Sequence, residues 1–256
     1  MSAIPLRRPY QGVVQILRFN WRTYVASAAF ISLAAMAWPL LGLLARLILL
    51  AGVVPALFWL ASSLAVSHYV YDRFPLYDLS WIPRALSRAP RRWINIHCGL
   101  DETSALLADV FPIAVGQVVD IFDPRVTTES SIRVARREAK RYGSLPALSA
   151  QYNRLPFAAG SFDAAFSIFA AHELRHPHQR VGLFREIARV LAPGGDLVLM
   201  EHSRDWRNFF AFGPGFLHFF SPRAWRSAIA SAGLTLQSEF SMTPFVRVYI
   251  VGKAAL

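Results

Sequence analysis

The chain has 256 residues, a net charge of +11 and an apolar fraction of 54%. This length accommodates one compact domain of about 150 to 200 residues and a shorter appended element. The mean hydropathy of +0.34 is high for a soluble protein, and the apolar excess is concentrated in Tyr24–Tyr71. The single cysteine, Cys98, excludes an intramolecular disulfide and therefore the class of disulfide-stabilised secreted scaffolds.

The apolar stretch Tyr24–Tyr71 contains only one charged residue, Arg46. A straight helix of this length would run about 70 Å, whereas the hydrocarbon core of a bilayer is about 30 Å thick. Because Pro39 and Arg46 lie near its middle, we expect a hairpin of two transmembrane helices, Tyr24–Leu41 and Leu47–Val70. A helical hairpin buried in a soluble core is the alternative, and the near absence of polar residues disfavours it.

Basic residues flank the apolar stretch on both sides. They are Arg7, Arg8, Arg18 and Arg22 before it, and Arg73, Arg84, Arg88, Arg91 and Arg92 after it. Each contributes about 1 kcal/mol of attraction near an anionic leaflet, so we expect the lipid bilayer as the polyanionic partner and no nucleic acid. The positive-inside rule then predicts an inner or plasma membrane protein with both termini and the catalytic domain in the cytoplasm.

The remainder of the chain has the pattern of an α/β domain. We expect a membrane anchor at 1–72, a basic linker at 73–92 and the domain at 93–256. The expected strands are Trp93–His97, Val115–Phe122, Asp163–Phe169, Asp196–Glu201 and Val246–Gly252, and the expected helices are Ser104–Val110, Ser130–Arg141, Val181–Leu191 and Pro222–Ala232. This alternation is typical of a Rossmann-like, mostly parallel sheet with flanking helices.

The segment 155–200 carries an ordered set of short motifs. A Leu-Pro-Phe and a Ser-Phe-Asp precede one expected strand, and an Arg-Glu-x-x-Arg-Val-Leu-x-Pro-Gly-Gly helix end precedes the next. These motif residues are Leu155, Pro156, Phe157, Ser161, Phe162, Asp163, Arg185, Glu186, Arg189, Val190, Leu191, Pro193, Gly194 and Gly195. The segment closely resembles the small-molecule class I methyltransferases that include the ubiquinone and menaquinone methyltransferases. The resemblance covers 93–253 and implies S-adenosylmethionine (SAM) as the cofactor.

An acid that follows the second strand of such a domain takes the ribose hydroxyls of the cofactor. Asp123 follows the run Val118–Phe122 and can accept both hydroxyl protons, so we assign it this role. Asp120 is the competing candidate. A solvated turn or a helix N-cap is the structural alternative for either residue.

The first turn departs from the family pattern of an acid followed by three glycines. His97 stands at the acidic position, Gly99 at the first glycine, and Asp101 and Thr103 at the other two. His97, Gly99 and Asp101 are the expected cofactor contacts here, and Asp101 or Glu102 would pair with the methionine ammonium of SAM. Loss of SAM binding is the alternative, because side chains replace glycines against the ligand.

In the resembling family an acid just before the Leu-Pro-Phe segment holds the adenine amino group. Gln151, Tyr152 and Asn153 occupy that neighbourhood in this chain. Gln151 or Asn153 would supply an amide acceptor and Tyr152 an aromatic face. We therefore expect these three residues to contact the adenine.

The loop after the fourth expected strand carries His172, Glu173, His176 and His178. A neutral imidazole accepts a proton near pH 7, so we expect His172 with Glu173 to be the catalytic acid/base pair, a purely structural role being the alternative. The histidine spacing, interrupted by Pro177, and the lack of cysteine ligands predict no metal.

Phenylalanines crowd the segment Phe209–Phe220, which is broken by glycine and proline and which we expect not to form a regular helix. It would line an apolar channel or dip into the bilayer surface, a folded core loop being the alternative.

These features predict a membrane-anchored SAM-dependent methyltransferase that acts on a lipophilic, membrane-resident small molecule such as a quinone precursor or a lipid headgroup. The altered glycine turn supports the alternative of a catalytically degenerate membrane scaffold or sensor with the same fold. A nucleic-acid methyltransferase rests on basic charge alone.

Overall fold

The computed structural model describes residues 9–142 and 145–253, which separate into two compact units. The sheet unit comprises Leu76–Asp205 and Leu217–Leu256. The helical unit comprises Leu6–Pro75 together with Trp206–Phe216. The chain therefore leaves the sheet unit once, after Asp205, and returns to it at Leu217.

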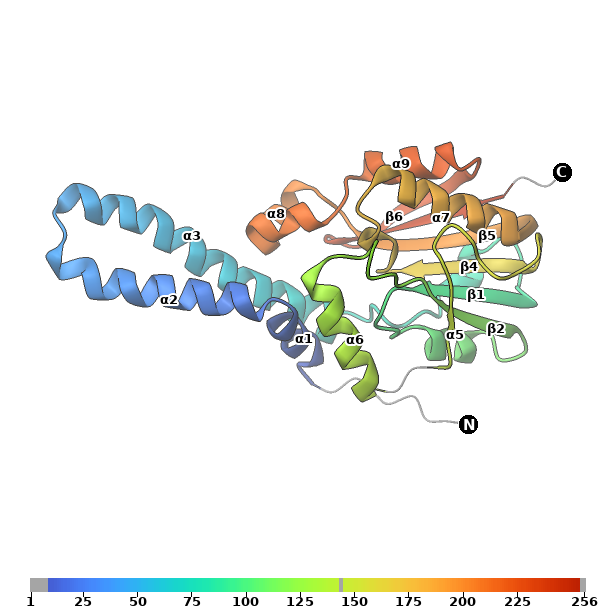
Figure 1. The fold of residues 1–256 in the computed structure, drawn as a ribbon, viewed down its shortest axis with the longest axis horizontal. Coiled ribbons are helices and arrows are strands. Elements are labelled where there is room, and N and C mark those ends of the chain that lie inside the picture. Colours follow the sequence, from blue (N-terminus) through green and yellow to red (C-terminus); the bar gives the residue numbers. More distant parts are fainter. Residues whose placement is uncertain (1–8, 143–144, 254–256) are drawn as a thin grey trace. The chain divides into compact units, whose positions relative to one another are not determined.

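The sheet unit is built on one seven-stranded sheet with the order β3-β2-β1-β4-β5-β7-β6 (Figure 1). The strands are β1 (Arg92–His97), β2 (Val115–Asp120), β3 (Leu148–Ser149), β4 (Phe162–Ile168), β5 (Leu191–His202), β6 (Thr235–Thr243) and β7 (Val246–Gly252). Strands β1 to β5 are parallel to one another, whereas β7 is antiparallel to both β5 and β6. The predicted Rossmann-like, mostly parallel sheet with flanking helices is thus confirmed.

Helices cover both faces of the sheet and bury its apolar residues. The helices of this unit are α4 (Ile82–Ala85), α5 (Ser104–Val110), α6 (Ser130–Tyr142), α7 (Pro177–Val190) and α9 (Pro222–Ser231). On one face, Phe184 of α7 and Trp225 of α9 join a core with Ile94 and Ile96 of β1. On the other face, the ring of Trp93 packs edge-on against Phe166 of β4. The strand period of two explains why alternate residues of β1 enter different cores.

Two strands and three helices, α4, α8 (Trp206–Phe212) and a further helix α1 (Gln11–Phe19), go beyond the expected elements. Strand β3 has only two residues, and β6 is an edge strand whose residues are largely exposed. Such segments lack the buried apolar runs that reveal central strands. Helix α1 is short and amphipathic.

The helical unit contains the expected pair of long apolar helices. Helix α2 spans Trp21–Ala37 and continues into a 3-10 turn at Trp38–Leu40, and α3 spans Leu43–Ser67 and continues into a π-helical turn at His68–Arg73. Two segments, Trp21–Leu40 and Leu43–Arg73, are long and apolar enough to cross a membrane. Many of their large apolar side chains are exposed, including Leu33, Met36, Leu40, Leu43, Leu44 and Ile48. Length and composition alone are weak support for a membrane location.

Arg46 lies in the first turn of α3, next to the connection between the two helices, and thus near the middle of the apolar stretch as predicted. Its Nε donates a hydrogen bond to the Trp38 carbonyl oxygen at 3.1 Å, and its guanidinium lies 5.4 Å from the Trp38 ring centroid. The single charge of the apolar stretch is thus held at the end of the hairpin, where it satisfies a helix-terminal carbonyl.

The phenylalanine-rich segment forms helix α8 (Trp206–Phe212) followed by a 3-10 turn (Gly213–His218), so the expectation of no regular helix was wrong for Phe209–Phe212. Phe209 packs edge-on against Trp59 of α3 at 5.3 Å, and Ser62 donates a hydrogen bond to the Phe210 carbonyl. The glycine and proline end the helix only after Phe212, which leaves α8 free to pack on α3.

Candidate functional site

The candidate site residues follow the carboxyl ends of neighbouring parallel strands. His97 ends β1 and pairs in register with Asp120, which ends β2. Gln151 comes just after β3, His172 and Glu173 follow β4, and all of these belong to the sheet unit. Parallel strands place their carboxyl ends at one edge of a sheet, where open α/β folds bind ligands.

The turn after β1 requires its one glycine. Gly99 has a φ of +124°, and a Cβ added there would lie 3.0 Å from Arg136 and 3.2 Å from Ile132 of α6. Its N–H donates to His97 Nδ1 at 3.3 Å. Burial lowers the pKa of His97, so the ring is neutral with its proton on Nε2. That buried Nε2 atom has no hydrogen-bond partner among the described residues.

Asp101 has a structural task in addition to any ligand contact. Its Oδ1 accepts hydrogen bonds from the backbone N–H groups of Thr103 and Ser104, at 3.1 and 2.9 Å, where helix α5 begins. Its Oδ2 is buried and has no partner within the described chain. Glu102, the other acid considered for the methionine ammonium, accepts a hydrogen bond from the Tyr77 hydroxyl at 2.9 Å. Of the two acids considered for the methionine ammonium, Asp101 is therefore the one with an unsatisfied buried oxygen.

The two ribose candidates have different surroundings. Asp120 is the last residue of β2, and its Oδ2 accepts a 2.6 Å hydrogen bond from Arg136. Asp123 lies in the following turn and pairs with the exposed Arg125, whose hydrogen bonds lower the pKa of Asp123. Asp120 thus lies at the strand end opposite His97, and Asp123 lies in the turn that follows.

The three expected adenine contacts lie just beyond the end of β3, next to Asp120 of β2. Gln151 forms an isolated bridge with Arg154, and Gln151 and Asn153 are exposed. Tyr152 instead packs toward α7, because a Cβ on Gly182 would lie 3.1 Å from its ring. The amide side chains are therefore available to a ligand, whereas the Tyr152 ring is partly committed to the core.

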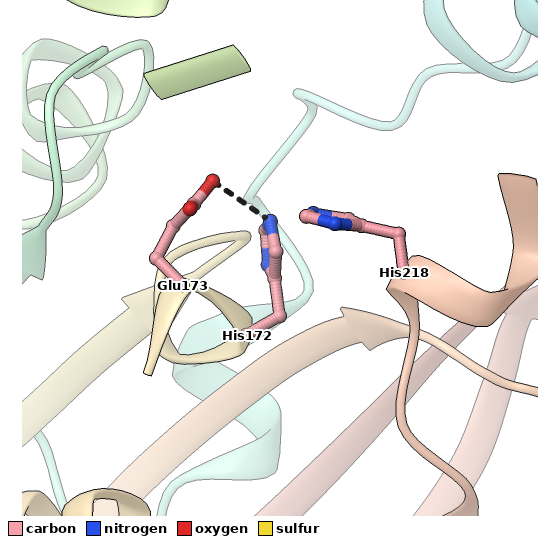
Figure 2. Close-up of side chains that lie close together, drawn as sticks. All are labelled: His172, Glu173 and His218. Carbon is pink, nitrogen blue, oxygen red and sulfur yellow. Dashed lines mark ion pairs between the residues drawn. The ribbon is translucent and has the colours of Figure 1, made fainter. Parts of the chain in front are cut away.

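The best-defined cluster of charged groups lies after β4 and β5 (Figure 2). His172 Nδ1 is 2.7 Å from Glu201 Oε2, and His172 Nε2 is 3.5 Å from Glu173 Oε1. Glu201 belongs to β5 and its side chain is 1% exposed. The His218 ring stands edge-on to that of His172 with centroids 5.1 Å apart.

The charge state of His172 differs from the expected neutral imidazole. Burial by itself would lower its pKa, but the Glu201 charge and the hydrogen bonds to both carboxylates raise it to about 10. His172 therefore carries its proton at neutral pH and is not a free base. Burial and the charge of His172 lower the pKa of His218 to about 3, so this second ring is neutral.

Two members of the cluster were missed at the sequence level. Glu201 was taken only as a strand end, and His218 only as part of an apolar segment; no local pattern links either to His172. The residues weighed with His172 as ligands, His176 and His178, instead stack on each other at 5.5 Å, with His176 capping helix α7.

Residues 96–199 match the family model described as a methyltransferase domain. Demethylmenaquinone methyltransferase of Thermus thermophilus is 33% identical over 129 residues, which are 48% of this chain and 54% of that protein. Malonyl-[acyl-carrier protein] O-methyltransferase of Legionella pneumophila is 32% identical over 117 residues, which are 44% of this chain and 37% of that protein. The chain thus spans about half or less of the length of these curated relatives.

A crystal structure of a SAM-dependent methyltransferase from Methanosarcina mazei has the same fold, with a TM-score of 0.51 and 18% identity. It covers 70% of this chain and 100% of its own. The strand order is that of a Rossmann-like fold. The methyltransferase domain matched by the family model, residues 96–199, runs from the end of β1 into β5, and a domain of this kind takes SAM as its cofactor.

The residues at the carboxyl end of β1 fit this cofactor. The unsatisfied His97 Nε2–H is a donor suited to a carboxylate or a hydroxyl, and the unsatisfied Asp101 Oδ2 is an acceptor suited to an ammonium. SAM carries all three groups. Orphaned buried polar atoms of complementary kind at a ligand-binding sheet edge are consistent with a cofactor site.

Proposed function

We propose that the protein is a membrane-anchored methyltransferase whose acceptor is a lipophilic molecule that resides in the membrane, of the quinone-precursor kind. The observation that carries the proposal is the presence, in one chain, of a methyltransferase domain and two exposed apolar helices of membrane-spanning length. A relative named demethylmenaquinone methyltransferase supports a quinone-like acceptor. In this proposal the sheet unit and both termini face the cytoplasm.

The phenylalanine-rich segment supports an acceptor that comes from the bilayer. Helix α8 belongs to the helical unit and packs on α3, yet it lies between β5 and α9 in the sequence. Trp206 and Phe210 of α8 are exposed. An exposed apolar helix beside a membrane-spanning helix fits the lipid interface, where aromatic rings are favoured.

Bound SAM supplies an electrophilic methyl group, and the chain's own residues would bind and orient the reactants. His97, Asp101 and Asp120 would hold the cofactor at the ends of β1 and β2. His172, whose ring is fixed by Glu201 and lies next to Glu173, would orient the methyl acceptor. Positioning in a water-poor site is the main contribution that such a domain makes to an in-line displacement.

The direct test uses the full-length protein purified in detergent and SAM with a labelled methyl group. Incubation with a lipid extract should transfer label into the organic phase, and incubation with a lipid-free extract should not. The variant Asp120→Ala, defective in cofactor binding, is the matched control. Label that appears only in the lipid-free extract would contradict the membrane-resident acceptor.

A catalytically silent scaffold is the second candidate, and a specific observation favours it. Asp101 and Thr103 replace two family glycines, and Asp101 is engaged at the start of α5. This candidate predicts no SAM binding, or SAM binding without transfer to any extract. Titration calorimetry that shows no SAM binding would favour this candidate, whereas SAM binding would leave the decision to the transfer of labelled methyl groups.

A further inference from the structure

We propose that His172, Glu173 and His218 form a binding site for one divalent transition-metal ion of the zinc type. Within the described residues, one potential ligand atom from each of these three side chains lies within 4.8 Å of the others. Figure 2 shows the three side chains gathered in the sheet unit. Two histidines and one glutamate are a ligand set that leaves positions open for solvent or substrate.

The distance between the first two ligands already suits one ion. A tetrahedral ion with bonds of about 2.1 Å separates its ligand atoms by about 3.4 Å. His172 Nε2 and Glu173 Oε1 are 3.5 Å apart. The ion would take the place of the proton that now lies between a carboxylate and this imidazole.

The second carboxylate oxygen of Glu173 is an observation independent of that distance. Glu173 is 7% exposed, and its Oε2 has no hydrogen-bond partner among the described residues. A buried carboxylate oxygen without a partner loses its hydration without compensation. Coordination to a cation is one of the few ways to satisfy it.

A carboxylate also lies near the Nδ1 atom of each histidine. Glu201 accepts from His172 Nδ1 at 2.7 Å and from the His172 backbone N–H at 3.2 Å, which fixes the ring and leaves Nε2 for a ligand bond. Glu129 Oε2 lies 4.0 Å from His218 Nδ1. Histidines that ligate metals characteristically donate their other N–H to a carboxylate.

Arg175 holds the backbone of the two histidines in place. Its Nη1 donates to the carbonyl oxygens of His172 and His218, at 3.0 and 2.6 Å, and its Nε lies 3.5 Å from Glu129. The guanidinium is thereby tied to backbone oxygens and a carboxylate. Arg180 and Arg204 also lie within electrostatic range of this cluster, so three guanidiniums face the carboxylates of Glu129, Glu173 and Glu201. A divalent cation would therefore bind in exchange for the proton of His172.

A bound ion would act as a Lewis acid toward oxygen atoms of the methyl acceptor. This role rests on the proposed function, whereas metal binding itself does not. Binding is therefore measured without SAM and without an acceptor, and a failure of methyl transfer would leave the metal measurement intact.

The experiment uses the untagged full-length protein in detergent after removal of metals with a chelator. Co²⁺ is titrated by visible absorption, and Zn²⁺ by competition with a chromophoric chelator. We expect one ion per chain. Glu173→Gln and His218→Gln should each weaken binding at least tenfold, and the positioning variant Glu201→Gln about 10- to 100-fold.

His176→Gln combined with His178→Gln is the matched control, because these histidines lie in the same loop region but outside the cluster; it should bind as the wild type does. A second measurement does not depend on variant folding: proton NMR of the Co²⁺-loaded wild type should show two shifted imidazole N–H signals. Absence of saturable binding, binding unchanged in Glu173→Gln and His218→Gln, or equal loss in the control would overturn the proposal.

Discussion

Glu186 of α7 accepts a 2.8 Å hydrogen bond from the backbone N–H of Leu155, at the start of the Leu-Pro-Phe segment. Arg189 completes this contact by donating to the carbonyl oxygens of Leu155 and Phe157, at 3.0 and 2.8 Å, and to Glu186. The motifs that identify the family in the sequence therefore bind each other. Their chemistry is structural: a charged pair on a helix satisfies the backbone of the segment leading to β4.

Replacing Glu186 should destabilise the sheet unit without abolishing its fold. Glu186→Ala removes a mostly buried acceptor and leaves Arg189 without its ion pair, a loss of about 1 to 3 kcal/mol. Hydrogen exchange of β4 peptides, followed by mass spectrometry, should show faster opening. The control is Arg185→Ala, an exposed neighbour on α7, and equal acceleration in both variants would argue against this role.

The same pair predicts a pH dependence. Hydrogen bonds from Arg189 lower the pKa of Glu186 against the opposing effect of burial, and the Leu155 N–H lowers it further. A depressed folded-state pKa contributes stability above the unfolded value of about 4.3 that is lost as the pH falls through the folded value. The stability difference between wild type and Glu186→Gln should therefore shrink on acidification below about pH 4.3. A difference that grows in acid would contradict the assignment.

Asp120 and Asp123 can be separated by SAM affinity. Loss of a hydrogen bond to a charged acceptor costs about 1.5 to 3 kcal/mol, so Asp120→Asn should weaken SAM binding about 10- to 150-fold. Asp123→Asn should change it less than about twofold on the same reasoning, because its carboxylate is engaged by Arg125 on the turn. Calorimetry measures the SAM affinity of both variants. The variant Arg136→Gln shows the effect on this affinity of breaking the Asp120 ion pair alone. A larger loss of SAM affinity in Asp123→Asn than in Asp120→Asn would assign the ribose contact to Asp123.

Asp72 anchors the short helix α1 within the helical unit. Its two carboxylate oxygens accept from the N–H groups of Gly12 and Val13, at 2.7 and 3.3 Å, and its side chain is 3% exposed. Asp72→Ala should release the first turn of α1, with a cost of about 0.5 to 2 kcal/mol. Hydrogen exchange of the Gln11–Phe19 peptide should accelerate, whereas Asp78→Ala, an exposed change, should leave it unaltered.

The proposed topology is testable because the chain has one cysteine. Cys98 is buried, and burial raises the pKa of its thiol, so it reacts poorly with maleimides. In a Cys98→Ser background, Leu41→Cys at the hairpin connection should label in intact cells with an impermeant maleimide. Ile113→Cys, 98% exposed in the sheet unit, should label only after permeabilisation. Labelling of both in intact cells, or of neither, would contradict a cytoplasmic domain on a spanning hairpin.

The elements that could be predicted are those with strong local patterns. Strands β1, β4 and β7 are buried apolar runs, α7 has helical spacing, and the apolar hairpin has two bilayer lengths of almost uncharged sequence. Edge strand β6 lacks such a pattern because its side chains are largely solvated. Helix α8 was missed because the glycines and prolines of its segment were assumed to act along its whole length.

The site was less predictable because its contacts join distant parts of the chain. His172 was found from its position after β4, but its charge is set by Glu201 on a neighbouring strand and its ring neighbour is His218. Asp123 and Asp120 could not be separated from the sequence, because the sequence predicts a strand that continues to Phe122 whereas β2 ends at Asp120. Boundaries of this kind depend on the register between strands, which no single segment encodes.

Helix α8 has a short connection in the sequence to the charged cluster. The segment Trp206–Phe216 belongs to the helical unit, where Phe209 of α8 packs on Trp59 of α3, and the chain returns to the sheet unit at Leu217, one residue before His218. Loss of the Trp59–Phe209 contact would therefore loosen the segment of chain that leads directly into His218.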